Sequence, residues 1–146
     1  MATSQAESLS VLYEQDETAW LEAMAELVAQ RRYAEMDHVH LSEYLADMAR
    51  RDRRVVFSRL VVLMSHLLKW QHQPEIRSGS WRGTMRAQRR ELRQLLESGT
   101  LRAHALAVLG DAYAEARKQA ADETELAVEV FPEENAWSLE ELLSDE

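Results

Sequence analysis

The sequence contains no cysteine and only two prolines and four glycines among its 146 residues. The lack of cysteine excludes disulfides, thiolate metal sites and cysteine nucleophiles. The scarcity of proline and glycine argues against collagen-like, linker-rich and turn-rich β-sandwich proteins. A chain of this length corresponds to about one domain with a core of its own. We therefore expect a globular protein rather than a fibrous or disulfide-stapled one.

No targeting or membrane segment is evident in the sequence. The first residues show neither the basic nor the apolar region of a secretory signal. The longest apolar stretch, 61–68, is interrupted by Ser65 and His66, and it is far shorter than the ~20 residues that a membrane helix needs. We expect a cytoplasmic protein without a membrane partner.

Charge is segregated along the chain, although the net charge is −9. Residues 1–48 carry 2 basic and 10 acidic side chains, residues 49–102 carry 13 and 4, and residues 103–146 carry 2 and 12. Two explanations fit this order. In the first, which we favour, acidic helices neutralise a basic centre within the molecule. In the second, the basic centre is a surface for an anionic partner.

The first half of the chain shows helical periodicity after an aperiodic start. We predict a flexible tail over 1–12 and a single helical domain over 13–146. Asp16 and Asp37 are the expected N-caps of the first two helices. Asp52 indicates a break before a third helix over about 53–73, although one long bent helix is an alternative. That third segment is apolar nearly all round, which is typical of a central helix.

The second half predicts three further helices. Pro74 ends the preceding helix, and Ser80 is the expected cap of a fourth helix that runs to Ser98, with Gly99 as its stop. An alanine-rich helix follows, and Ser138 begins a capping box before a short terminal helix. The pattern therefore predicts an all-α fold, a bundle of about five main helices plus a short C-terminal helix.

The first candidate site lies at the predicted bend between the third and fourth helices. His66, Lys69 and Trp70 are three and four residues apart and share one side of a helix. A helix N-terminus with arginines nearby favours anions. The bend is either a small pocket for phosphate, carboxylate or a partner's acidic side chain, or a buried corner in which tryptophans pack and the cations meet carbonyls or acidic residues of the first helix. We favour the buried corner. The residues concerned are His66, Lys69, Trp70, Gln73, Arg77, Trp81 and Arg82.

The second candidate site is an arginine stripe on the predicted fourth helix, formed by Arg82, Arg86, Arg89 and Arg93. Arginine forks bind carboxylate and phosphate through two parallel hydrogen bonds. The acidic chain, the lack of aromatic residues within the stripe and the lack of a DNA-binding signature argue against nucleic acid. We expect ion pairs with the acidic first or fifth helix, or with a partner protein. A near-3.5-residue repeat along 81–95 also allows a homodimer.

Metal, cofactor and catalytic motifs give no positive signal. Glu35-x-x-His38 has the spacing of helical di-iron sites and His40 lies nearby, but those sites need a second such motif, which the sequence lacks. We expect solvated residues there, and no metal or other cofactor. Glycine-rich phosphate loops and nucleophile elbows are absent. An enzyme is therefore less favoured than a binding protein, and His66 is the one residue suspected of proton transfer.

A set of residues along most of the chain resembles a known family. The most specific block runs from His66-Leu67-Leu68-Lys69-Trp70 through Gln73-Pro74 to Ser80-Trp81, and further matches extend the resemblance over about 13–143. Those matches are Tyr13, Asp16, Trp20, Gln88-Arg89, Leu101, Tyr113, Ala116-Arg117, Glu123-Thr124, Phe131-Pro132 and Leu142-Leu143. The chain resembles the bacterial Domain of Unknown Function 29 family, which implies a helical fold and no assigned activity. We expect a protein-interaction or regulatory module, and the alternative is an anion-binding or weak nucleic-acid-binding domain that uses the arginine stripe.

Overall fold

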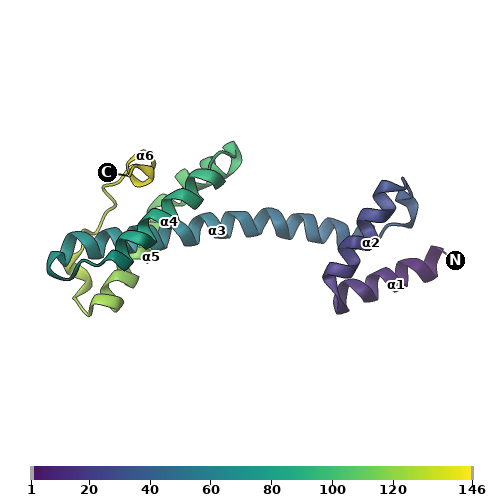
Figure 1. The fold of residues 1–146 in the computed structure, drawn as a ribbon, viewed down its shortest axis with the longest axis horizontal. Helices are drawn as coiled ribbons and strands as arrows, with labels where there is room; N and C mark the ends of the chain where they lie inside the picture. The colour runs from purple at the N-terminus through teal and green to yellow at the C-terminus, as the bar shows by residue number, and fades with distance from the viewer. Residues whose placement is uncertain (1, 146) are drawn as a thin grey trace. The chain divides into compact units, whose positions relative to one another are not determined.

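The computed structural model describes residues 2–145 (Figure 1), and within them the predicted all-α fold is confirmed, with no strand. Five long helices precede a short one: α1 (Ala2–Gln15), α2 (Glu17–Ala29), α3 (His38–His72), α4 (Gly79–Leu95), α5 (Gly99–Thr124) and α6 (Leu139–Leu143). Three single-turn 3-10 helices, η1 (Tyr33–Glu35), η2 (Pro74–Ile76) and η3 (Val128–Val130), lie in the connections.

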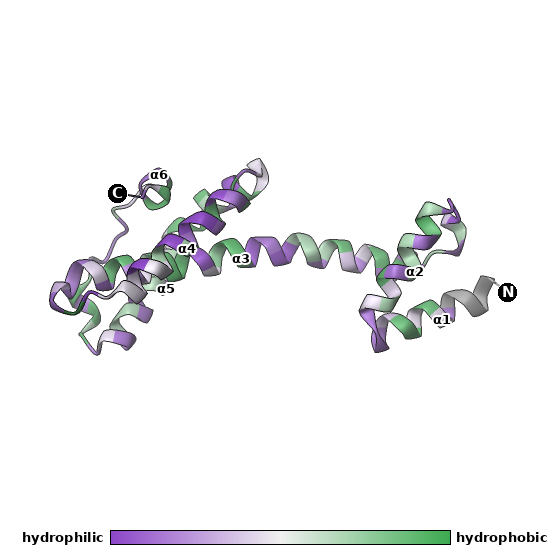
Figure 2. Cartoon of the chain, in the orientation of Figure 1, coloured by the Kyte–Doolittle hydropathy of each residue, from purple (hydrophilic) through white to green (hydrophobic). Residues whose placement is uncertain are grey.

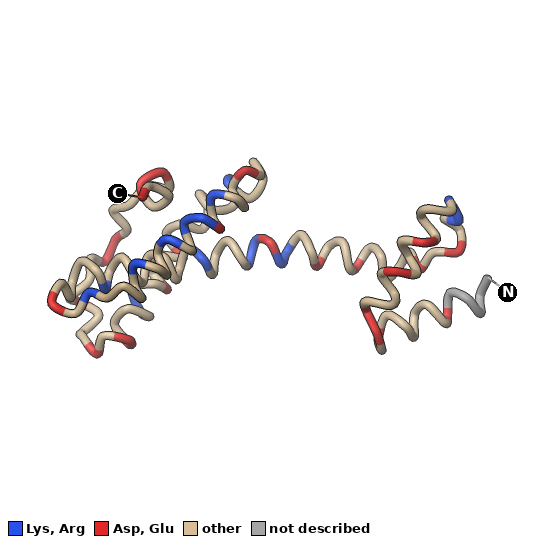
Figure 3. Tube along the Cα trace, in the orientation of Figure 1, with Lys and Arg blue, Asp and Glu red and all other residues tan. Residues whose placement is uncertain are grey.

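The chain divides into two compact units, Met1–Ala49 and Arg50–Glu146, where the sequence pattern predicted one domain over 13–146. We refer to them as the N-terminal and C-terminal units. Each unit has a hydrophobic cluster of its own. Acidic side chains dominate the N-terminal unit, whereas the lysine and arginine side chains gather on α4 and on the part of α3 that follows residue 49 (Figure 3).

In the N-terminal unit, the segment predicted to be a flexible tail belongs to helix α1. Leu9 is buried in the cluster around Trp20, and Leu12 and Tyr13 pack beside it. The Tyr13 ring lies edge-on to the Trp20 ring, with centroids 4.8 Å apart. These three apolar positions form one helical face, and that face packs in the cluster around Trp20 of α2.

Helix α3 is continuous, so the break predicted at Asp52 is wrong and the long-helix alternative is right. Asp52 is exposed within the helix, where an aspartate costs less than about 1 kcal/mol. Flanking arginines place positive charge beside its carboxylate. The predicted cap at Asp37 is confirmed, since its Oδ1 accepts a hydrogen bond from the backbone N–H of His40 at 3.3 Å.

The C-terminal unit packs α4, α5 and α6 around the second half of α3. Leu60, Leu63 and Met64 of α3 are fully buried, as the all-round apolar pattern predicted. Alanines of α5 at 105, 112, 116 and 120 are also fully buried, and their small side chains let the helices approach closely. The alternation of apolar and polar segments along these helices is visible in Figure 2.

Side-chain caps mark where helices α2, α4, α5 and α6 begin. The predicted caps at Asp16 and Ser138 are confirmed, the second as a full capping box with Glu141. The predicted cap at Ser80 is wrong, because Ser78 accepts the hydrogen bond from the Trp81 N–H at 3.2 Å. Gly99 is not the stop of α4 but the first residue of α5, which Ser98 caps.

Candidate functional site

Lys69, at the end of α3, forms an ion pair inside the C-terminal unit. Its side chain is buried, and its Nζ donates a hydrogen bond to Oε2 of Glu123 on α5 at 2.5 Å. The same ammonium lies 5.4 Å from the centroid of the Trp81 ring. The carboxylate partner therefore comes from α5, and not from the first helix as the buried-corner hypothesis predicted.

The contact with Lys69 changes the pKa of the Glu123 carboxyl. Partial burial by itself would raise its pKa, but hydrogen bonds from Lys69 and Gln119 and the charge of Lys69 outweigh burial and lower the pKa below the usual value. The Glu123 carboxylate therefore stays charged at neutral pH, and its contact with Lys69 ties α3 to α5.

His66 lies one turn before Lys69 and is half-buried. Its Nδ1 is 2.8 Å from the Val62 carbonyl oxygen, which assigns a donated Nδ1–H hydrogen bond. Burial lowers the pKa of His66, and the positive charge of Lys69 lowers it further, against the raising effects of the Val62 carbonyl and Glu123. The imidazole is therefore neutral at neutral pH, and its geometry is that of a packing residue.

Trp70, Arg77 and Arg82 form a separate arrangement at the bend. The guanidinium carbons of Arg77 and Arg82 lie 4.7 Å and 5.4 Å from the centroid of the Trp70 indole. Arg77 also donates from Nε to the Trp70 carbonyl at 2.7 Å. Cation–π contacts of this kind contribute about 0.5–1 kcal/mol at exposed sites, so the indole holds both arginines in place.

A cleft of about 600 Å³ opens beside Trp70. We call it the Trp70 cleft, and its walls come from the end of α3, from α4 and from the C-terminal segment. Its volume lies in the range of small-molecule pockets. The walls carry both signs of charge and two indoles: Leu67, Trp70, Gln71, Arg82, Met85, Arg89, Trp137, Glu141, Ser144 and Asp145.

The second half of the arginine stripe holds α6. Arg89 donates from Nε to the Leu142 carbonyl at 2.9 Å, and Arg93 donates from Nε and Nη2 to the Leu143 carbonyl at 2.9 Å and 2.6 Å. These carbonyls lie in the last turn of α6, which leaves them without helical partners. Arg93 also pairs with Asp145 at 2.7 Å. The predicted ion pairing thus involves the C-terminal segment and not the first or fifth helix.

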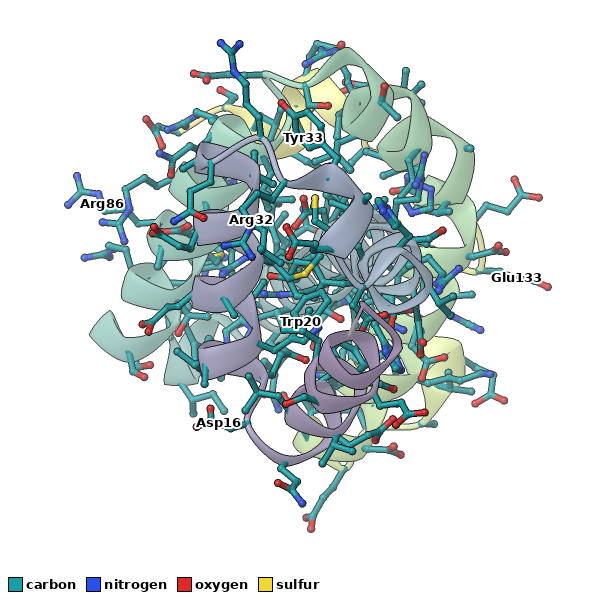
Figure 4. All side chains as sticks on the ribbon, turned by 90° about the vertical axis from the view of Figure 1, so that its right-hand side faces the viewer. Asp16, Trp20, Arg32, Tyr33, Arg86 and Glu133 are labelled. Carbon is teal, nitrogen blue, oxygen red and sulfur yellow. The ribbon has the colours of Figure 1, made fainter. Side chains whose placement is uncertain are left out.

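The first half of the stripe differs. Within residues 2–145, Arg82 and Arg86 have no carboxylate within 4 Å. Both side chains are exposed, and Arg86 extends away from its helix in Figure 4. The hydrogen bond from Arg93 is the main cause that lowers the pKa of Asp145, and the positive charges of Arg93, Arg89 and Arg86 lower it further.

The predicted site residues therefore fall into three sets. Trp70, Arg82 and Arg89 line one cleft, with Arg77 on the same indole. His66, Lys69 and Trp81 belong to the packing between helices, and Arg86 and Arg93 complete the stripe. Sequence reasoning missed Trp137, Glu141 and Asp145, which come from a segment more than 50 residues away along the chain. The acidic character of that segment was the available signal.

The side chains of the suspected metal motif, Glu35, His38 and His40, each contact a different partner. Glu35 pairs with Arg32 at 2.5 Å, whereas His38 Nε2 lies 2.6 Å from the Tyr33 carbonyl. His40 lies against Asp37 at 2.7 Å and stacks on the Tyr13 ring. Among the described residues, no group of three or more histidine, aspartate or glutamate side chains is arranged to hold a metal ion.

Asp37 organises the core of the N-terminal unit. Its Oδ2 also accepts a hydrogen bond from the buried Trp20 indole N–H at 3.2 Å. Burial would raise the pKa of Asp37, but the hydrogen bonds from His40 and Trp20 lower it below the usual value. The aspartate is therefore a buried acceptor that fixes α3 to α2.

Comparisons with known proteins identify a family but no individual relative. In the part of the chain that was searched, residues 2–145, no helix has the length and apolar character needed to span a membrane. Neither the comparison with curated proteins nor the comparison with solved structures found a match. The family model described as "Domain of unknown function DUF29" matches residues 12–146. The chain therefore belongs to the DUF29 family.

Proposed function

We propose that this protein is a protein-interaction module whose recognition surface lies at the bend between α3 and α4. We call this the bend surface, and it consists of Trp70, Ile76, Arg77, Arg82 and Arg86. The observation that carries the proposal is that Arg82 and Arg86 have no carboxylate partner within residues 2–145, whereas Arg89 and Arg93 bind the carbonyls of α6 and Arg93 also pairs with Asp145.

The geometry of Arg82 suits recognition of an acidic group. Its guanidinium rests on the Trp70 ring at 5.4 Å, which restricts the side chain while its N–H donors stay available. A pre-positioned guanidinium loses less entropy when it binds a carboxylate. Ile76, which is 57% exposed, adds apolar area next to the arginines. Arginine and tryptophan are enriched among the residues that contribute most to protein interfaces.

Within the chain, two arginines already bind acidic residues of the C-terminal segment. Arg93 pairs with Asp145, and Arg102 at the start of α5 pairs with Glu140 at 2.8 Å. Leu139 and Leu142 of the same segment are buried in the core. An acidic segment with leucines is thus what Arg93 and Arg102 hold within the chain, and we infer a partner of similar character for the bend surface.

A capture experiment with matched variants tests the proposal. Purified tagged protein is incubated with a lysate of the producing organism, and bound proteins are quantified for wild type and for Arg82→Glu with Arg86→Glu. We expect a specific protein whose capture falls at least about tenfold in the double variant, because each lost charge-assisted contact costs about 1 kcal/mol or more. The control is Arg90→Glu with Lys118→Glu, which makes the same charge change at two exposed positions.

Two outcomes would contradict the proposal. A partner lost equally in the control double variant would show that only net charge matters. Binding of an oligonucleotide at ~50 mM salt that falls with log salt at about −0.9 per phosphate contact, with no protein captured, would favour the nucleic-acid alternative.

A further inference from the structure

A second surface of the C-terminal unit lies far along α3 from the bend and was not among the predicted sites. It is a groove of about 550 Å³ between the Arg50–Ser58 stretch of α3 and α5. We call it the α3–α5 groove. Its lining residues are Arg50, Arg53, Arg54, Phe57, Ser58, His104 and Val108.

The floor of the groove is apolar. Phe57 and Val108 are half-buried and pack against the hydrophobic core of the unit. Their outer faces line the groove and stay in contact with solvent. Exposed apolar surface that is continuous with a core and rimmed by charge is typical of a binding site for another protein.

The rim of the groove is cationic. Arg53 and Arg54 have no carboxylate within 4 Å in the described residues. The arginine run that supplies them is interrupted by Asp52 alone, and it forms a blue band on α3 in Figure 3. A potential of one sign over a low-dielectric floor attracts groups of the opposite charge.

An apolar floor together with a cationic rim suits an acidic amphipathic helix better than nucleic acid. Nucleic acid would place phosphates over the rim, but the floor offers an aliphatic side chain and a half-buried ring rather than exposed stacking platforms. An amphipathic helix has an apolar stripe for the floor and acidic flanks for the arginines. The lining stretch of α3 covers about 12 Å at ~1.5 Å per residue, which matches two to three turns of such a helix.

We propose that the α3–α5 groove binds an acidic amphipathic helix of a partner protein, with apolar side chains on Phe57 and Val108 and carboxylates on Arg53 and Arg54. This proposal is independent of the bend surface, because it uses another stretch of α3, helix α5 in place of α4, and other arginines. Failure of either one leaves the other standing.

The test uses the full chain and a synthetic probe. The probe is a fluorescein-labelled peptide of about four helical turns, with leucines at i, i+4, i+7 and i+11 and glutamates on both flanks. We expect saturable binding by fluorescence anisotropy. Arg53→Glu with Arg54→Glu should weaken binding at least about tenfold, since two charge-assisted contacts become repulsive. Lys118→Glu, a single charge reversal at an exposed position on another part of α5, is the control for general charge effects and should change binding less than about twofold.

A third variant separates docking from simple charge attraction. Ser58 is exposed and lines the groove, so Ser58→Arg fills the groove while it adds a positive charge. We expect weaker binding of the peptide to this variant, whereas attraction by charge alone would make it tighter. Circular dichroism checks that each variant keeps its helices.

The proposal would be overturned if peptide binding does not saturate below about 1 mM, or if Ser58→Arg binds the peptide more tightly than wild type. It would also be overturned if Lys118→Glu weakens binding as much as the double variant does. Equal binding of a peptide with the same composition in scrambled order would contradict it as well. Competition by a duplex oligonucleotide combined with failure of the peptide to bind would identify nucleic acid as the occupant. Dissociation of a protein dimer on addition of peptide, measured by light scattering, would identify a second copy instead, and this too would overturn the proposal.

Discussion

At the scale of single residues, the buried cation of α3 is the most consequential contact of the C-terminal unit. The Lys69 side chain is 8% exposed, whereas its partner Glu123 is 42% exposed. The two ends of the ion pair are therefore unequal, because a carboxylate left alone at this position regains water and an ammonium left alone does not.

This inequality leads to a prediction about the two deletions. Glu123→Ala should lower the free energy of unfolding by about 2–3 kcal/mol, since it leaves a buried ammonium without a counter-charge. Lys69→Met should lower it by only about 1 kcal/mol or less, because Glu123 can hydrate. Urea denaturation at pH 7 measures both, and Lys69→Met combined with Glu123→Gln serves as the control because it should resemble Lys69→Met. Equal losses in the two single variants would contradict the prediction.

At the scale of elements, helix α6 depends on arginines supplied by α4. It has only five residues, and helices this short are not stable by themselves. Its capping box at Ser138 satisfies the first turn, and Arg89 and Arg93 satisfy the carbonyls of the last turn. Burial of Leu139 and Leu142 then fixes its position on the unit.

Removal of one arginine should therefore loosen this element while the other helices stay folded. Arg93→Ala deletes two hydrogen bonds to Leu143 and the pair with Asp145, a local loss of about 1–3 kcal/mol. We expect amide hydrogen exchange in 139–145 to accelerate by about tenfold or more. Arg90→Ala is the control, because Arg90 is 71% exposed and its one ion pair among residues 2–145 is with its neighbour Glu91. Equal acceleration in Arg90→Ala, or none in Arg93→Ala, would show that these bonds do not hold α6.

At the scale of the whole molecule, the two units have separate cores, and each contains an acid–base contact with a lowered pKa. The carboxyls of Asp37, Glu123 and Asp145 and the imidazole of His66 all have folded-state pKa values below their ordinary ones. A group of this kind binds protons less readily in the folded chain than in the unfolded chain. The free energy of unfolding therefore falls as pH falls.

His66 dominates the first part of this fall. Its contribution is complete above the unfolded pKa of 6.5 and is lost as the pH drops from there through the lowered folded value. Urea denaturation between pH 8 and 5, monitored by tryptophan fluorescence, should show declining stability for wild type and a smaller decline for His66→Gln over that interval. Stability that rises on acidification would contradict the prediction.

Much of this architecture could be predicted from local sequence. Helical periodicity predicted the all-α class and the positions of α2, α4, α5 and α6, although it divided α3 into two helices. Asp16, Asp37 and Ser138 were recognised as caps because a cap acts within three residues of itself. Leu60, Leu63 and Met64 were recognised as a buried face for the same local reason. The first helix was missed because its opening residues are polar, and its order depends on Leu9 meeting Trp20 of another helix.

By itself the sequence determined the helical class and the concentration of arginine in the middle of the chain, because composition and periodicity are properties of neighbouring residues. Its motif residues also determined the family. Only the tertiary structure decided which arginines are engaged. Arg89 and Arg93 meet a segment about 50 residues further on, Lys69 meets Glu123 on α5, and Arg82 rests on Trp70. Such pairings depend on how distant helices pack, and the same stripe of identical residues therefore divides into a structural half and a half that we propose meets a partner.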